Sequence, residues 1–490
     1  MSQPQKVIVV GAGIAGIATA IRLAVQGYDV EVFEKNGVVG GKMYLIERNG
    51  FLFDAGPSLF TQPQNITALF EYAGEPIDDY LKFSKVSIAC KYFFENGVVV
   101  NAFTDQQAFA RELSEKLGEP ERNVISYLKE SSRVYENVGK IFLNYSLRSI
   151  STWLHPRIFS AIRSVGFSHL FDSLNTFNRK RFKTNEAIQI FNRFATYNGS
   201  NPFKAPGMLS LIPHLEQNEG TFYPAGGMIS IPRALESLAR KKGVKISLGK
   251  SVEKIVSDDN KVQGVFVDGV FFPSDIVVSN VDIFYTYKNL LGDIAKSNKV
   301  LKNERSSSAL IFYWGINRNF PDLHLHNIFF SNDYQSEFDH LFDKKTFFHD
   351  PTIYINITSK MEEGQAPNGK ENWFVMVNAP AKEGADWTKE VRDVRRHVID
   401  KLSRIMGADI ANCIEEEEVL TPEGIQKRTD SYLGSLYGTS SNSKWAAFLR
   451  HANYTTAVKG LFFAGGSVHP GGGIPLCLKS ARIVCDLIEE

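Results

Sequence analysis

Apolar positions in the first third of the chain alternate between short β-branched runs and longer, helix-like stretches. Lys6 to Val10 is a β-branched run that predicts a buried strand, and glycines follow it directly. A largely apolar segment then leads to a second strand-like run, Asp29 to Phe33, which ends at Glu34. A strand, a glycine turn, a helix and a further strand in this order predict the first unit of a parallel α/β sheet.

The same kind of pattern returns much later in the chain. A helical period is followed by strand-like runs, which are separated by turn signals at residues 258–260 and at Asp268-Gly269. The last stretch, residues 460–490, predicts a strand, a glycine turn and a helix. The predicted helix covers Ile231–Lys242, and the predicted strands are Val244–Leu248, Val252–Val256, Val262–Val267 and Ile276–Ser279.

These stretches predict an α/β protein whose nucleotide-binding domain is discontinuous. An insertion that leaves a parallel sheet from its loops is tolerated, so the residues between the stretches are assigned to a second, α+β domain. The predicted first domain is Rossmann-like and comprises residues 1–85, 221–295 and 441–490. The predicted second domain comprises residues 86–220 and 296–440 and is expected to bind substrate and to associate with a membrane.

The glycines after the first strand carry the clearest chemistry. Gly11, Gly13 and Gly16 allow a tight turn, close approach of the backbone to a pyrophosphate, and close packing of the next helix. The N-terminus of that helix offers free N–H groups to phosphate. Glu34 lies 18 residues after Gly16, near the offset of about 20 expected for an acid on a ribose 2′-hydroxyl. Because a carboxylate would repel a 2′-phosphate, the expected ligand contains an unphosphorylated ADP moiety.

A membrane segment is the rival interpretation of the same residues. Val7 to Val25 is mostly apolar and close to the roughly 20 residues that span a bilayer. It contains three glycines and Arg22, and it has no basic lead-in and no small-residue cleavage site. These features favour the nucleotide-binding interpretation over a signal peptide or membrane anchor.

Composition narrows the possible functions. A net charge of +1 over 490 residues gives no overall positive electrostatic potential that would attract nucleic acid. Four cysteines without a CxxC pair predict reduced thiols and a cytoplasmic protein. His324 and His326 are the one close histidine pair, and with a single acid beside them they predict a surface role and no metal site. The 36 phenylalanines are compatible with a large apolar cavity or with a Phe-rich core.

Residues 141–183 interleave aromatic and aliphatic side chains with basic ones, and Asp172 is the only acid between Arg148 and Lys183. This composition is typical of an interfacial helix on an anionic bilayer. A helix that faces the protein core has a similar composition, so both interpretations stay open. The basic residues are Arg148, Arg157, Arg163, Arg179, Lys180, Arg181 and Lys183.

The motifs taken together resemble the flavin-dependent amine oxidase superfamily and, within it, the bacterial-type phytoene desaturase family of carotenoid desaturases and isomerases. The matching pieces are Gly11–Gly16 with Glu34, Gly40-Gly41-Lys42, Phe53–Ser58, Tyr223–Gly227, Gly434–Gly438 and, most specifically, His469–Pro475. They extend over essentially the whole chain. Leu476 departs from the family pattern, since phytoene desaturases carry a glycine there. The sequence is most similar to the hydroxycarotenoid 3,4-desaturase branch.

The resemblance implies FAD as cofactor and assigns its contacts. The first glycines approach the pyrophosphate, Glu34 holds the ribose and Val252 offers its backbone to the adenine. Pro475 also suits the first turn of a helix, whose N-terminus favours negative charge on reduced flavin. The implied FAD-binding residues are Gly11, Gly13, Ile14, Ala15, Gly16, Glu34, Lys35, Gly40, Gly41, Lys42, Gly56, Pro57, Ser58, Val252, Gly465, Gly466, Gly473, Ile474 and Pro475.

The implied reaction is desaturation of a carotenoid, with hydride transfer to the flavin and loss of a proton from the adjacent carbon. No second GxGxxG is visible, which argues against NAD(P)H as a co-substrate. The resemblance implies quinone or oxygen as the electron acceptor. A peripheral position on the inner face of the membrane is expected. The catalytic acid or base stays unassigned; His155 and Arg157 are candidates that also suit structural roles. A carotenoid cis–trans isomerase and a non-redox prenyl-lipid escort protein of the same fold are the alternatives.

Overall fold

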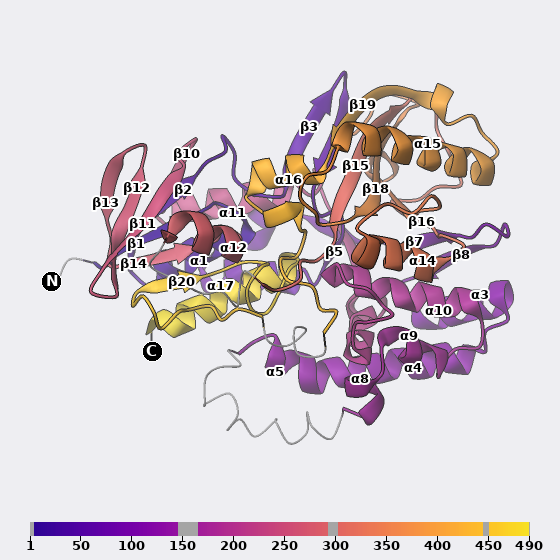
Figure 1. Ribbon diagram of the computed structural model, residues 1–490, viewed down its shortest axis with the longest axis horizontal. Helices are drawn as coiled ribbons and strands as arrows, with labels where there is room; N and C mark the ends of the chain where they lie inside the picture. The colour runs from indigo at the N-terminus through magenta and orange to yellow at the C-terminus, as the bar shows by residue number, and fades with distance from the viewer. Residues whose placement is uncertain (1–3, 146–164, 293–301, 444–449, 490) are drawn as a thin grey trace.

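The computed structural model describes residues 4–145, 165–292, 302–443 and 450–489. Its two main parts lie side by side (Figure 1). One part is built on a five-stranded parallel sheet and the other on a seven-stranded, mostly antiparallel sheet. The predicted α/β class is therefore confirmed.

The parallel sheet has the strand order β10-β2-β1-β14-β20. Its central strand pairs with a neighbour on each side, Val7 facing Val30 of β2 and Ile276 of β14. A strand that pairs on both edges and is covered on both faces has a continuous run of apolar residues, as β1 does. The strands are β1 (Lys6–Val10), β2 (Asp29–Glu34), β10 (Lys245–Leu248), β14 (Ile276–Ser279) and β20 (Leu461–Phe463).

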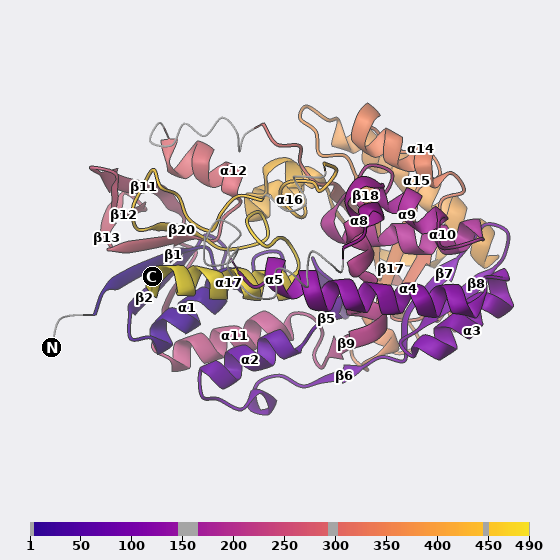
Figure 2. The same ribbon diagram turned by 90° about the horizontal axis from the view of Figure 1, so that it is seen from below.

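Alternate residues of β1 point to two different layers. Val7 and Val9 pack against helices α1, α2, α11 and α17, which lie on one side of the sheet (Figure 2). Ile8 and Val10 pack against the small sheet β11-β12-β13. The helices are α1 (Ile14–Val25), α2 (Gln64–Tyr72), α11 (Ser230–Lys241) and α17 (Ile474–Glu489), and the strands are β11 (Val252–Asp258), β12 (Lys261–Val267) and β13 (Val270–Pro273).

The hairpin β12-β13 and the segment Val7 to Val25 both lie in the first part of the molecule. Asp268 and Gly269 have φ of 49° and 74° between β12 and β13, as a tight hairpin requires. Val7 to Val25 forms β1, a turn and α1 inside the core, so the membrane-segment interpretation is wrong. Within the ranges that the structure describes, no helix is both long enough and apolar enough to span a membrane.

The larger sheet has the order β19-β15-β18-β17-β16-β7-β8, and α15 (Trp387–Met406) packs on it through Val394, Val398 and Leu402. All its strands fall in the two stretches predicted for the second domain, whose exact boundaries stay a prediction. The strands are β7 (Ile88–Phe93), β8 (Val99–Phe103), β15 (Ser308–Ile316), β16 (His326–Phe329), β17 (Ile353–Ile357), β18 (Glu371–Ala379) and β19 (Ile414–Leu420).

A helical layer packs beside this sheet and shares an aromatic core with it. Two π-helical turns, η2 (Tyr135–Gly139) and η5 (His214–Glu219), interrupt the layer next to the cavity described below. The helices are α3 (Gln106–Leu117), α4 (Glu121–Val134), α5 (Lys140–Phe142), α8 (Phe167–Phe171), α9 (Leu174–Arg179), α10 (Asn185–Asn192) and α14 (Tyr334–Asp339).

Short elements join the two parts. The hairpin β3-β4 contacts β18, and α16 lies next to β15. A three-stranded sheet, β5-β9-β6, brings residues 60–61, 221–224 and 83–85 together. These elements are β3 (Tyr44–Arg48), β4 (Phe51–Ala55), β5 (Phe60–Thr61), β6 (Phe83–Lys85), β9 (Thr221–Pro224), α12 (Ile283–Tyr285) and α16 (Pro422–Thr429).

Candidate active site

A cavity of about 550 Å³ is lined by residues from both parts of the molecule. All the predicted cofactor-binding residues line it except Gly16 and Gly465. The structure thus brings together residues that are up to 464 positions apart, from Gly11 to Pro475.

The glycine turn after β1 forms the first wall. Gly11 has φ of +97° and donates its N–H to the carbonyl of Phe33 at 2.8 Å. Ile14 and Ala15 begin α1 and line the cavity. Gly16 does not line it: a Cβ there would lie 2.2 Å from the carbonyl oxygen of Gly11. Gly16 therefore allows α1 to pack closely on the turn, the helix-packing role expected of the third glycine.

Glu34 ends β2 and turns its carboxylate toward this wall. Oε2 accepts the N–H of Ala12 at 2.7 Å, and Oε1 accepts the backbone and side-chain N–H groups of Asn36 at 2.9 and 2.6 Å. The neighbouring Lys35 donates to Asp430 at 2.6 Å and so ties β2 to the segment after α16. The carboxylate is held at the carboxyl edge of a parallel sheet, where nucleotides bind.

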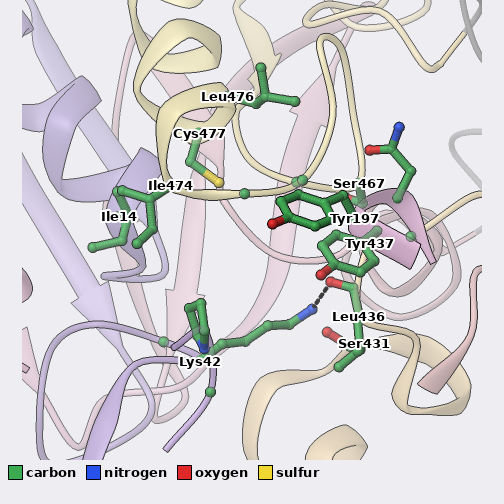
Figure 3. A pocket seen from close by; sticks show the side chains of 18 of the residues that line it. Ile14, Lys42, Tyr197, Ser431, Leu436, Tyr437, Ser467, Ile474, Leu476 and Cys477 are labelled. Carbon is green, nitrogen blue, oxygen red and sulfur yellow. Dashed lines mark hydrogen bonds between the residues drawn. The ribbon is translucent and has the colours of Figure 1, made fainter. Parts of the chain in front are cut away.

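Lys42 connects this wall to the far end of the chain. Its Nζ donates to the carbonyl oxygens of Ser435 and Leu436 at 3.2 and 2.7 Å (Figure 3). Burial lowers the pKa of Lys42 to about 8. Gly56 lies against its backbone with φ of +97°, and a Cβ there would be 1.9 Å from the carbonyl oxygen of Lys42. Only glycine fits this close approach.

The C-terminal glycine segment forms the opposite wall. Gly466, Gly473, Ile474 and Pro475 line the cavity, and Pro475 is in the first turn of α17, as predicted. Gly473 has φ of +112°, and a Cβ there would meet no atom within 4 Å. Gly465 does not line the cavity; a Cβ there would lie 2.8 Å from Nδ2 of Asn280. In Figure 3, Ile14 and Ile474 lie at one side of the cavity, and Tyr197 and Tyr437 lie at the other.

Asn280 is a site residue that the sequence analysis missed. Its backbone N–H donates to Val10 and its Nδ2 donates to Ala464, both at 2.8 Å. It thereby joins the strand ends β1, β14 and β20, and it lines the cavity beside Gly13. A polar residue directly after the predicted strand Ile276–Ser279 was the available signal, because ligands bind at the carboxyl ends of such strands.

Arg450 is a second site residue that no sequence motif indicated. It lines the cavity, and its Nη1 donates to the carbonyl oxygens of Tyr437 and Gly466 at 2.6 and 3.2 Å. Burial, followed by the charge of Arg305, lowers the pKa of Arg450 to about 10. Nη2 is buried and has no hydrogen-bond partner among the described residues. A buried cation with an unused donor is costly unless a ligand supplies an acceptor or negative charge.

The second part of the molecule contributes polar groups to the same cavity. The hydroxyls of Ser58 and Tyr354 are hydrogen-bonded at 2.6 Å, and Nδ1 of His326 is 2.8 Å from the Tyr354 hydroxyl. His326 lies in β16 and is 2% exposed, so its predicted surface role is wrong. Burial, with a smaller effect of Arg193, lowers the pKa of His326 to about 3. The candidates His155 and Arg157 lie outside the described residues.

Much of the rest of this wall is apolar. Its aliphatic and aromatic side chains come from the helical layer and from the inner face of the larger sheet, and they include Leu209, Leu211, Ile212, Leu215, Ile311, Ile328 and Phe374. One end of the cavity is therefore lined by glycines, whose backbone a phosphate can approach closely, and by the carboxylate of Glu34. The other end is apolar. The unused donor of Arg450, the space beside Gly473 and the first turn of α17 fit a bound flavin dinucleotide.

Comparisons with known proteins agree with this geometry. Residues 14–488 match the family model "Flavin containing amine oxidoreductase". The chain is 46% identical to a 1-hydroxycarotenoid 3,4-desaturase of Flavobacterium sp. (strain P99-3), over 99% of each protein. It is 32% identical to a phytoene desaturase of Fusarium fujikuroi, over 99% of this chain and 89% of that protein.

The fold is also that of solved structures in this class. Wild-type putrescine oxidase bound to putrescine superimposes with a TM-score of 0.63 at 14% identity, covering 99% of both chains. The resemblance seen in the sequence motifs is confirmed by the family match over nearly the whole chain. The chain belongs to the flavin-containing amine oxidoreductase family and is an FAD-dependent oxidoreductase.

Proposed function

We propose that this protein introduces a carbon–carbon double bond into a carotenoid, at the 3,4 position of a hydroxylated or monocyclic substrate. The single observation that carries the proposal is one cavity, lined both by the two glycine walls and by many aliphatic and aromatic side chains of the second part. The 46% identity to a 1-hydroxycarotenoid 3,4-desaturase supports the hydroxylated substrate. Leu476, where the family's phytoene desaturases carry glycine, lines this cavity and supports it as well.

FAD, when bound, supplies the hydride acceptor. We assign its pyrophosphate to Gly11 and Gly13, its ribose to Glu34 and its adenine to the backbone of Val252. The ring system would then lie between Gly56–Ser58 and Gly473–Pro475. Arg450 and the first turn of α17 would favour negative charge at that end. The proposed electron acceptor is quinone or oxygen.

The protein's own residues position the substrate and exclude water. Leu209, Ile212 and Leu215 from the helical layer line the apolar end of the cavity together with Ile328 and Phe374 from the sheet. Apolar walls hold a polyene without solvent and keep the bond that reacts at a fixed place. The residue that accepts the proton is not assigned in this proposal.

Expression in hosts that accumulate phytoene, lycopene or hydroxylated γ-carotene tests the proposed reaction. We expect a product two hydrogen atoms lighter in the hydroxylated host, because desaturation removes a hydride and a proton. Chromatography and mass spectrometry of the pigments provide the measurement. An isomer of unchanged mass would support the isomerase instead. Unchanged pigments in every host, with FAD-loaded protein present, would leave a binding protein as the better explanation.

We also propose that the protein binds peripherally to the inner face of the membrane. A carotenoid that crossed water would expose apolar surface at about 0.8 kcal/mol per CH₂, so direct transfer from lipid is favoured. In α8, Phe167, Leu170 and Phe171 are 75%, 40% and 52% exposed. The exposed Arg179 ends α9, and the exposed Lys180 follows it. Exposed aromatic rings beside basic residues suit an anionic bilayer.

Replacing Phe167 and Phe171 together by serine should weaken binding to phosphatidylserine vesicles by about 10-fold or more, since each buried ring contributes about 1.5–3 kcal/mol. Salt should weaken binding of the unchanged protein. Sedimentation with vesicles measures both effects. The matched control replaces Val270 and Phe271, 57% and 41% exposed on the β12-β13 hairpin, by serine. Equal loss in both double variants would contradict this docking surface.

One basic residue of this region is unsuitable for a test of membrane contact. Arg181 belongs to residues 141–183, yet it donates from Nε and Nη2 to Glu130 at 2.8 Å and its guanidinium lies 3.3 Å from the ring centre of Phe177. It holds α4 to α9. A charge reversal at Arg181 would disturb the fold as well as any membrane contact, so it is left unchanged in this test.

A further inference from the structure

A buried polar cluster interrupts the apolar end of the cavity. Arg193 donates from Nη2 to Oε1 and Oε2 of Glu216 at 2.8 and 3.0 Å and to the Tyr92 hydroxyl at 2.8 Å. The Tyr197 hydroxyl also donates to Glu216. Arg193, Tyr197 and Glu216 line the cavity, and the Glu216 side chain is 1% exposed. We define these three residues as the polar cluster.

The cluster lies close to the residues assigned to the flavin. A Cβ on Gly199, two positions after Tyr197, would lie 2.9 Å from the Tyr437 ring, and a Cβ on Gly472 would lie 2.6 Å from the same ring. The Tyr437 ring therefore contacts both the segment that follows Tyr197 and the C-terminal glycine turn. The charge of Arg193 also acts on His326, which is hydrogen-bonded to Tyr354 and through it to Ser58.

The local backbone holds the cluster in place. Glu216 lies in the π-helical turn η5, and Arg193 begins the 3₁₀ segment η3 (Arg193–Asn198) that follows α10. π-helical turns are rare and occur often at functional sites. The Arg193 guanidinium also lies 4.5 Å from the ring centre of Phe194. These contacts fix the direction of the side chains before any substrate enters.

Stability alone does not account for this arrangement. A buried ion pair is often no more stable than well-packed apolar residues, so it is weak support for a purely structural role. In the described part of the chain, every hydrogen bond of the guanidinium comes from Nη2, and Nε has no partner. Arg193 and Glu216 thus place a charged pair in the lining of a cavity that many apolar side chains also line.

We propose that the polar cluster binds the hydroxyl group on the end group of the substrate. This inference rests on the proposed carotenoid desaturation. A hydroxyl can accept from the guanidinium and donate to the carboxylate, and a hydrocarbon end group can do neither. In a 1-hydroxy substrate, only one carbon separates the hydroxyl carbon from the 3,4 bond. A hydroxyl-binding group must then lie near the flavin, and the polar cluster lines the same cavity as the residues assigned to the flavin.

This role makes the cluster a source of specificity. An end group without the hydroxyl would place apolar surface against the charged groups of Arg193 and Glu216 and form no hydrogen bond with either. A site built to bind a hydroxyl rejects an analogue that lacks it. Binding of the hydroxyl by the polar cluster would also determine which bond reacts, because anchoring the end group fixes the 3,4 carbons relative to the flavin. Arg193 and Tyr197 are accordingly positioning residues for the reaction.

The test is a competition between two substrates in the same vesicles. FAD-loaded enzyme receives equal amounts of a 1-hydroxycarotenoid and its analogue that lacks the hydroxyl, and the ratio of the two desaturated products is measured. This ratio depends on the relative kcat/KM values and not on how much enzyme is folded. The variants are Arg193→Gln and Tyr197→Phe. Tyr127→Phe is the control, since Tyr127 is buried with Asn178 as partner at 2.8 Å and does not line the cavity.

The unchanged enzyme and Tyr127→Phe should prefer the hydroxylated substrate equally. Arg193→Gln should reduce that preference by about 10- to 100-fold, and Tyr197→Phe by about 2- to 10-fold, the effects of a charged and a neutral hydrogen bond. Preference unchanged in both variants, or lost equally in Tyr127→Phe, would overturn the inference while leaving the desaturase function intact. Conversion of neither substrate by the unchanged enzyme would overturn the proposed function itself.

Discussion

Gly16→Ala should largely abolish FAD retention. The new Cβ would lie 2.2 Å from the carbonyl oxygen of Gly11 and 2.9 Å from Oδ1 of Asn280. The first of these atoms is backbone and cannot rotate away, so α1 or the glycine turn must shift. We expect the free energy of unfolding to fall by about 1–3 kcal/mol or more. The displaced N–H groups of the turn would then no longer meet the pyrophosphate.

The measurement is the ratio of bound flavin to protein after gel filtration, together with thermal unfolding with and without added FAD. Gly37→Ala is the matched control: Gly37 follows the same strand β2, and a Cβ there would meet no atom within 4 Å. The control should keep its flavin. Full flavin occupancy in Gly16→Ala would show that α1 does not need this close contact.

Glu34→Ala should weaken FAD binding by about 10- to 100-fold. The carboxylate accepts the N–H of Ala12 and two N–H groups of Asn36, and we assign it to the ribose as well. Hydrogen bonds to a charged group contribute about 1.5–3 kcal/mol each, and about 1.4 kcal/mol is tenfold in affinity. Glu34→Gln keeps the shape and one acceptor oxygen, so we expect a smaller loss.

Titration of flavin-free protein with FAD, followed by fluorescence, gives the dissociation constants. Glu31→Ala serves as control because Glu31 is on the same strand but does not line the cavity and is instead 3.9 Å from Nζ of Lys6. Its affinity should match that of the unchanged protein. If the two alanine variants bind FAD equally well, the ribose assignment of Glu34 is wrong.

Local patterns predicted much of the first part of the molecule. β1 matches the predicted run Lys6–Val10, and β14 matches Ile276–Ser279. The turn at Asp268-Gly269 is also where it was expected. In each case, the signal lies in consecutive residues: β-branched side chains favour buried parallel strands, and glycine or aspartate favours positive φ in a hairpin.

The amino-acid sequence by itself determined the two glycine walls, the position of Glu34 and the α/β class, because spacing within a strand–turn–helix unit is set by backbone geometry. Only the tertiary structure decided that His326 is buried, that Asn280 joins three strand ends and that Arg450 lies in the site. The tertiary structure also decided the polar cluster. Arg193 and Glu216 are 23 positions apart, and the local sequence pattern of their elements does not predict how these elements pack. Contacts of that kind form when separate segments pack together, so folding of the whole chain decides them.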